Sequence, residues 1–192
     1  MPIKNRLSEL HAEIVGWRRD IHAHPELRFE EHRTAALIAE QLRGFGCDEV
    51  VTGVGKTGVV GVIRGHQNTT GMTIGFRADM DALPLQEMTD LPHASTHPGK
   101  MHACGHDMHM TSLVGTAKML MENTDKWSGT VMLVGQPAEE IISGAKAMLE
   151  DGLYQRFGVP DYAIGLHVSS GAPSGLVTVR EGIVQSSSDS VD

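Results

Sequence analysis

A thiol and an imidazole stand two residues apart near the middle of the chain, in the step Cys104-Gly105-His106. Both are ligand types that transition metals favour in proteins. In extended backbone, alternate side chains point to the same side, so Cys104 and His106 are expected to reach one ion or an adjacent pair. We expect Asp107 to cap a helix that begins at Met108.

Two acidic pairs follow apolar runs that are typical of strands. Asp79 and Asp81 alternate, so they are predicted to share one face and to hold ligand imidazoles in the correct tautomer; the alternative is a turn or cap residue. Glu139 and Glu140 are adjacent and diverge, so one can bind metal while the other transfers protons. Taken alone, the second pair would indicate a solvated acidic turn.

Histidines extend this set. His167 ends an expected buried strand, where a lone histidine is usually a satisfied core residue. His109 lies three residues past His106 on the expected helix, and we rank it below His106 as a residue beside the ligands or the substrate. His22 and His24 also have ligand-like spacing, but helix-end or surface contacts are favoured because no carboxylate or thiol stands beside them.

Apolar periodicity predicts elements that alternate between helix and strand. Expected helices cover residues 7–21, 29–42, 108–121 and 143–149, and expected strands cover residues 49–54, 58–64, 72–77, 129–136 and 162–167. Residues 85–100 form a long polar loop. This alternation, with 22 glycines for tight turns, favours a layered α/β sheet.

Charge and composition exclude several classes of partner. The formal charge of −8 over 192 residues argues against nucleic acid or an anionic membrane as partner. We find no apolar run of the roughly 18 residues that a membrane span needs, and the first residues lack the apolar centre of a signal peptide. A cytoplasmic location is therefore expected.

Three strand ends and one loop thus carry a thiol, imidazoles and carboxylates, which suit zinc, manganese, cobalt or nickel. A shared ligand allows two ions to lie close together. Such a site lowers the pKa of a bound water, and a free carboxylate beside it can take the water's proton and pass it to a leaving amine.

Six motifs, in order, resemble those of one enzyme family. They are Arg18–Leu27 (RRDIHAHPEL), Phe76–Pro84 (FRADMDALP), His102–Asp107 (HACGHD), Gln136–Glu140 (QPAEE), Gly144–Leu149 (GAKAML) and Leu166–Val168 (LHV). This series is similar to that of the hippurate hydrolase branch of the aminoacylase and carboxypeptidase-like metallopeptidases. That branch includes N-acyl-amino-acid amidohydrolases and plant indoleacetyl-amino-acid hydrolases.

The resemblance implies a role for each matched residue. Cys104 would bridge two metals, His106, Glu140 and His167 would be further ligands, and Glu139 would be the general base. Relatives elsewhere in the superfamily carry His-x-Asp where this chain has Asp79-Met80-Asp81, which supports a role behind the ligands for both aspartates. The implied reaction is metal-dependent hydrolysis of the amide bond of N-acyl amino acids, such as N-benzoyl or N-acetyl forms.

The resemblance also implies an incomplete fold. Residues 1–192 would form the N-terminal portion of a three-layer α/β/α zinc-peptidase-like catalytic domain. The inserted dimerisation domain would begin near residues 186–192, and a last metal-binding histidine would lie beyond them. Two divalent ions are expected in the full-length enzyme, and one or none here. The alternative is a catalytically inactive fragment that keeps the fold and weak metal binding and acts only by association.

Overall fold

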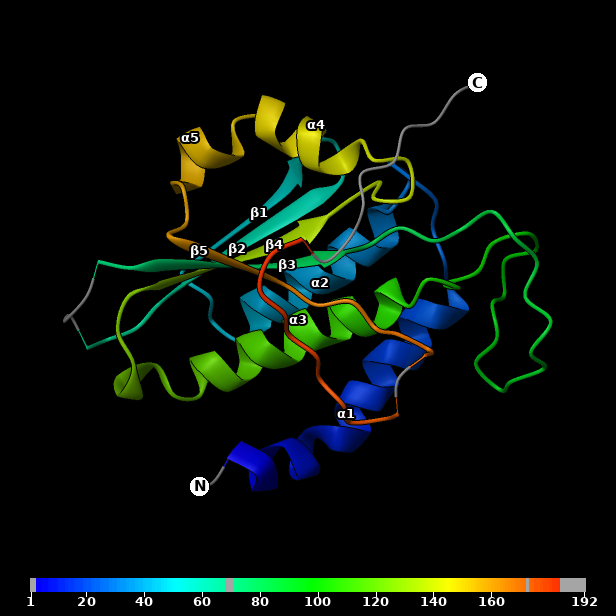
Figure 1. Ribbon diagram of the computed structural model, residues 1–192, viewed down its shortest axis with the longest axis horizontal. Coiled ribbons are helices and arrows are strands. Elements are labelled where there is room, and N and C mark those ends of the chain that lie inside the picture. Colours follow the sequence, from blue (N-terminus) through cyan, green and yellow to red (C-terminus); the bar gives the residue numbers. More distant parts are fainter. Residues whose placement is uncertain (1–2, 68–70, 172, 184–192) are drawn as a thin grey trace.

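The computed structural model describes residues 3–67, 71–171 and 173–183, which form a mixed five-stranded sheet between helices (Figure 1). The strands are β1 (Glu49–Val54), β2 (Gly58–Arg64), β3 (Thr73–Asp79), β4 (Thr130–Gln136) and β5 (Tyr162–Gly165). Their order is β1-β2-β4-β3-β5. β3 is parallel to β4 and β5, and β2 is antiparallel to β1 and β4. The carboxyl ends of the three neighbouring strands β4, β3 and β5 therefore lie at the same end of the sheet.

Helices cover both faces of this sheet. They are α1 (Ile3–Ala23), α2 (His32–Gly44), α3 (His106–Met121), α4 (Gly144–Glu150) and α5 (Leu153–Phe157), with a 3-10 turn η1 (Thr124–Lys126) after α3. α4 and α5 lie on one side of the sheet, and α1, α2 and α3 lie on the other (Figure 1). The expected α/β/α layering is confirmed. None of the helices in the described ranges is long and apolar enough to cross a bilayer.

Alternation along the central strands builds two cores. Val59 of β2 and Leu133 of β4 belong to the core that includes α2 and α3, while Val60 and Met132 belong to the core that includes Met148 of α4. Successive strand residues point to opposite faces, so a strand covered on both sides is apolar throughout. Burying each side chain of this size stabilises the fold by about 1.5–3 kcal/mol. A shift in strand register would lose this burial, so the register of the sheet and the positions of the strand ends are fixed.

Two expected elements differ in the structure. The strand at residues 162–167 was expected to be buried, but Tyr162 is 63% and Ile164 is 44% exposed, because β5 is the outermost strand of the described sheet. The second helix begins at His32 and not at Phe29, whose φ of 58° is left-handed. Residues 186–192, where an inserted domain was expected to begin, lie outside the described residues.

Candidate metal centre

The carboxyl ends of the parallel strands β3, β4 and β5 and the start of α3 meet at one end of the sheet. Asp81 lies two residues beyond β3, Glu139 three residues beyond β4, and His167 two residues beyond β5. His106 is the first residue of α3, and its side chain is fully buried. Residues that are far apart in the sequence therefore converge because parallel strands end together.

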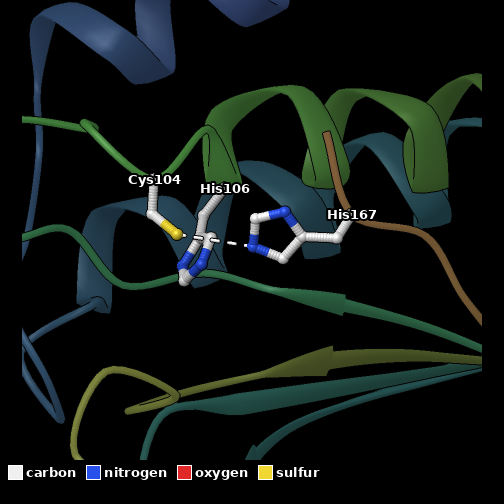
Figure 2. A group of neighbouring side chains, drawn as sticks. All are labelled: Cys104, His106 and His167. Carbon is white, nitrogen blue, oxygen red and sulfur yellow. Dashed lines mark hydrogen bonds between the residues drawn. The ribbon is translucent and has the colours of Figure 1, made fainter. Parts of the chain in front are cut away.

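The thiol and two imidazoles come together as Figure 2 shows. The Sγ of Cys104 lies 3.4 Å from Nε2 of His167. Candidate ligand atoms of Cys104, His106 and His167 all lie within 4.8 Å of one another. His106 is buried, Cys104 is half-buried and His167 is exposed. The site thus has a buried floor and an open side.

Gly105 makes this approach possible. We expected extended backbone here, but Gly105 has φ 86° and ψ 18°, a left-handed conformation that places it directly before α3. A Cβ on Gly105 would lie 2.4 Å from Cγ2 of Val168, far inside van der Waals contact. Glycine is therefore required both by the backbone angle and by the segment that carries His167.

The acidic pair after β4 faces the same histidine. Oε2 of Glu139 and Oε1 of Glu140 each lie 3.8 Å from Nε2 of His106. The carboxylate of Asp81 accepts the backbone N–H groups of Glu139 and Glu140, at 3.0 and 2.9 Å. Asp81 therefore fixes the backbone of the loop that carries both glutamates.

Two of the buried polar atoms that lack hydrogen-bond partners among the described residues lie at this site. Nδ1 of His106 lies 2.9 Å from the carbonyl oxygen of Asp81, which can only accept, so Nδ1 carries the proton. Nε2 of His106 and Oε1 of Glu140 are buried without a hydrogen-bond partner, and they lie 3.8 Å apart. Leaving such atoms unpaired is unfavourable. Together with the thiol, they fit a divalent cation.

His109 has a different environment from His106. Its Nδ1 donates to Oδ1 of Asp79 at 2.5 Å, and its Nε2 accepts the N–H of Val168 at 2.9 Å. The His109 and His167 rings lie 4.6 Å apart, centroid to centroid. Because both nitrogens of His109 are hydrogen-bonded, the ring holds the backbone beside His167 in place.

Comparison with known proteins identifies the family of this chain. The family described as Peptidase family M20/M25/M40 matches residues 75–185, which is more than half of the chain. The chain belongs to this family.

Individual relatives of this M20 chain agree along nearly its whole length. It is 47% identical to thermostable carboxypeptidase 1 of Saccharolobus solfataricus, over 97% of this chain and 47% of the relative. It is 46% identical to hippurate hydrolase of Campylobacter jejuni, over 95% of this chain and 46% of the relative. A Bacillus subtilis crystal structure, described as a dinuclear metal binding peptidase from the M20 family, superposes with a TM-score of 0.84 at 42% identity, covering 91% of this chain and 47% of that one. The chain spans about half the length of these relatives.

Negative charge accumulates at the candidate centre of this M20 chain. Burial, followed by the nearby Glu140 and Glu139 carboxylates, raises the pKa of the Cys104 thiol to about 12. Burial also raises the pKa of Glu140, against the lowering effect of His106. Burial lowers the pKa of His106, but Asp81 and the other carboxylates raise it further, to a net value above the ordinary one. A site of this kind favours positive charge.

Two sequence expectations about the same region are wrong. Asp107 does not cap α3, because the helix begins at His106 and the cap position is Gly105. Instead, the buried Asp107 carboxylate faces Arg18 and His22. His22 lies in the last turn of α1, but in place of helix-end or surface contacts it is only 3% exposed and pairs with Asp107 and Glu87. In contrast, His24 makes the expected helix-end contact, with the carbonyl oxygen of Asp20.

Three groups that contact residues around the candidate centre were not predicted from the sequence. Arg18 contacts Asp107, and Glu87 contacts His22 from within the polar loop. Arg18 lies in the RRDIHAHPEL motif, so the motif could have identified it. Nothing distinguished Glu87 from the other polar residues of its loop. The backbone N–H of Val168 could not be identified from residue type at all.

Proposed function

We propose that this chain forms the metal-binding part of a site that hydrolyses N-acyl amino acids. The observation that carries the proposal is the unpartnered pair of buried atoms, Nε2 of His106 and Oε1 of Glu140, beside the Cys104 thiol. Cys104, His106, Glu140 and His167 would hold the two divalent ions. Zinc, manganese, cobalt and nickel all suit this donor set.

Bound divalent ions would supply positive charge that polarises the substrate carbonyl and makes water more acidic. The chain's own residues would keep the ligands in place. Asp81 holds Nδ1 of His106 through its carbonyl oxygen and the glutamate loop through its carboxylate. Asp79 and His109 hold the backbone next to His167. Such supporting hydrogen bonds set the direction of metal ligands.

Glu139 would be the general base. Its side chain is 37% exposed and lies 3.8 Å from His106, so it faces both the site and approaching solvent. The Glu139 carboxylate would take a proton from water as the new C–O bond forms at the substrate carbonyl. It would then give that proton to the amide nitrogen as the C–N bond breaks, which releases a carboxylic acid and an amino acid.

The names of relatives support the substrate class. They include hippurate hydrolase of Campylobacter jejuni and N-acetylcysteine deacetylase of Bacillus subtilis. Both names describe cleavage of an acyl group from an amino acid. The larger of the two acyl groups is aromatic, so hippurate is the first substrate to test.

A second candidate function is binding without catalysis. Apolar side chains near the end of the described chain are exposed, for example Val177 at 73%, Val179 at 91% and Ile183 at 80%. Exposed apolar side chains are typical of surfaces that contact another polypeptide. In this alternative, the chain binds metal weakly and acts only through association.

The test is release of glycine from hippurate with added manganese or zinc. The chain is compared with Glu139→Gln, which keeps the side-chain shape but removes the base, and we expect the release rate to fall at least about 100-fold. Glu150→Gln is the matched control, because Glu150 is an exposed glutamate near Lys146 at the end of α4. Metal-dependent release that survives Glu139→Gln would contradict the assigned base. No release by any variant would favour the second candidate.

A further inference from the structure

A second cluster of buried charges lies beside the turn that carries Cys104 and His106, and the proposed reaction does not use it. The cluster contains Arg18 and His22 of α1, Glu87 of the loop at residues 85–100, and Asp107 of α3. The side chains of His22, Glu87 and Asp107 are at most 4% exposed. Buried charges persist only where they are paired.

The shortest contacts in this cluster join opposite charges, and one longer contact joins its two cations, since Nη2 of Arg18 lies 3.3 Å from Nδ1 of His22. Oδ2 of Asp107 lies 2.8 Å from Nδ1 of His22 and 2.8 Å from Nε of Arg18. Oδ1 of Asp107 accepts the N–H of Met108 at 3.0 Å. On the other side of the ring, Nε2 of His22 lies 3.2 Å from Oε1 of Glu87. His22 thus stands between two carboxylates.

This position determines the charge of His22. An ionised carboxylate can only accept hydrogen bonds, so both ring nitrogens of His22 must donate, and the ring is an imidazolium. The cluster then contains two cations, Arg18 and His22, and two anions, Glu87 and Asp107. The hydrogen bond to Asp107 and then that to Glu87 raise the pKa of His22 against the effect of burial, which agrees with this count.

Glu87 extends the cluster into the long loop. Its Oε2 accepts the N–H of Ser95 at 2.6 Å, and its Oε1 accepts the hydroxyl of Thr89 at 2.5 Å. One carboxylate therefore holds two separate positions of a loop that has no helix or strand of its own. Through His22, the same carboxylate is connected to Asp107, the residue next to His106.

We propose that His22 is a positioning residue of the metal centre, which fixes the first turn of α3 through Asp107 and joins that turn to the loop at residues 85–100 through Glu87. The inference rests on the proposed function in taking His106 as a metal ligand. Because coupling between two sites is reciprocal, order in the loop should strengthen metal binding, and metal should slow exchange in the loop.

The test uses cobalt(II), whose absorption reports a coordinated thiolate and the ligand geometry. His22→Gln removes the ability to donate to two opposite carboxylates. We expect cobalt affinity to fall about tenfold, as when a residue supporting a metal ligand is lost. We also expect an altered cobalt spectrum and faster amide hydrogen exchange in residues 85–100.

His24→Gln is the matched control. It makes the same chemical change two residues further along the chain, just past the end of α1, where Nδ1 hydrogen-bonds to the carbonyl oxygen of Asp20 and the ring lies 5.9 Å from that of His97. This variant lacks any contact with Asp107 or Glu87 and should keep the affinity and the spectrum of the parent chain. Glu87→Gln is the second test variant, for use if His22→Gln fails to fold. It keeps the pair of His22 and Asp107, so we expect a smaller loss of about threefold with faster loop exchange.

The outcomes separate this inference from the proposed function. A parent chain that binds no cobalt would overturn the metal centre itself. A parent chain that binds cobalt, with His22→Gln and Glu87→Gln unchanged in affinity and spectrum, would overturn only the positioning role. A lower melting temperature with an unchanged cobalt spectrum would show that His22 is merely structural, and would equally overturn it.

Discussion

Two groups of buried charged side chains adjoin the start of α3, and they differ in the balance of their charges. In the cluster of Arg18, His22, Glu87 and Asp107, cations and anions are equal in number and in contact. At the strand ends, carboxylates outnumber cations, and two buried atoms have no partner among the described residues. Satisfied polar groups contribute to a rigid structure, whereas unsatisfied groups are available to a ligand.

This difference gives each group its own expected response to mutation. Changes in the balanced cluster should lower stability, because they leave a buried charge without its partner. Changes to the ligand side chains at the strand ends should lower metal affinity and leave the stability of the metal-free chain nearly unchanged. A change to a ligand side chain that lowers both quantities equally would remove the distinction.

The largest expected effect is on stability, for Asp107→Ala. This change leaves Arg18 and His22 without their shared anion, so the free energy of unfolding should fall by about 3–5 kcal/mol. Urea denaturation measures it. Asp20→Ala is the control, because Asp20 pairs with Arg33 at 2.9 Å on a largely exposed surface and should cost under about 1 kcal/mol. Equal losses in the two variants would contradict the buried role of Asp107.

Glu140→Gln should lower metal affinity and leave stability nearly unchanged, the reverse of Asp107→Ala. Removing the carboxylate should weaken manganese or cobalt binding about 100-fold, the upper end of what loss of a supporting residue causes. The unfolding free energy of the metal-free chain should stay level or rise slightly, since burial already raises the pKa of Glu140. Calorimetric titration and urea denaturation together check this prediction. Glu150→Gln should change neither, and a large stability loss in Glu140→Gln alone would count against the metal role.

Gly105→Ala tests the contact between the two ligand segments. Gly99→Ala is the matched control, because Gly99 has φ 73° and no atom within 4 Å of an added Cβ. Both variants should lose about 1–2 kcal/mol of stability from left-handed strain. Only Gly105→Ala should also weaken cobalt binding, since its Cβ would displace Val168 and so His167. Adding Val168→Ala should restore part of the affinity, and failure to do so would argue against this contact.

The smallest expected effect is a pH dependence from His22. Its pKa is raised in the folded chain by the hydrogen bond to Asp107 and then that to Glu87. The stability that this provides is fully present below pH 6.5 and is lost as pH rises through the raised pKa. Each unit of difference corresponds to about 1.4 kcal/mol. Urea denaturation from pH 6 to 9 should show this loss in the parent chain and less of it in His22→Gln; identical curves would refute it.

Much of the fold could be predicted because the central strands are apolar on both faces. Val59, Val60 and Leu133 are buried in the two cores, so the runs that contain them stand out in the sequence. β5 was misassigned as buried because an apolar run does not show whether another strand lies beside it. The backbone at Gly105 was misassigned because glycine is compatible with both extended and left-handed angles.

The sequence predicts the residue types of the candidate ligands, but it does not predict the contacts that hold those ligands in place. Cys104, His106 and Glu140 belong to ordinary metal-ligand types, and the positions of strand ends brought them together. Asp107 was assigned as a cap because helix caps and buried ion pairs use the same residue. Its actual partner, His22, lies 85 positions away, and only the packing of α1 against α3 reveals the pair.

The unpaired side of β5 affects how this chain behaves in solution. Within the described sheet no strand pairs with that edge, and Tyr162 and Ile164 are exposed along it. Free edges bearing apolar side chains promote intermolecular pairing. Light scattering should therefore show self-association that grows with protein concentration, and titrations are best made on dilute samples, where each site reports on a single chain.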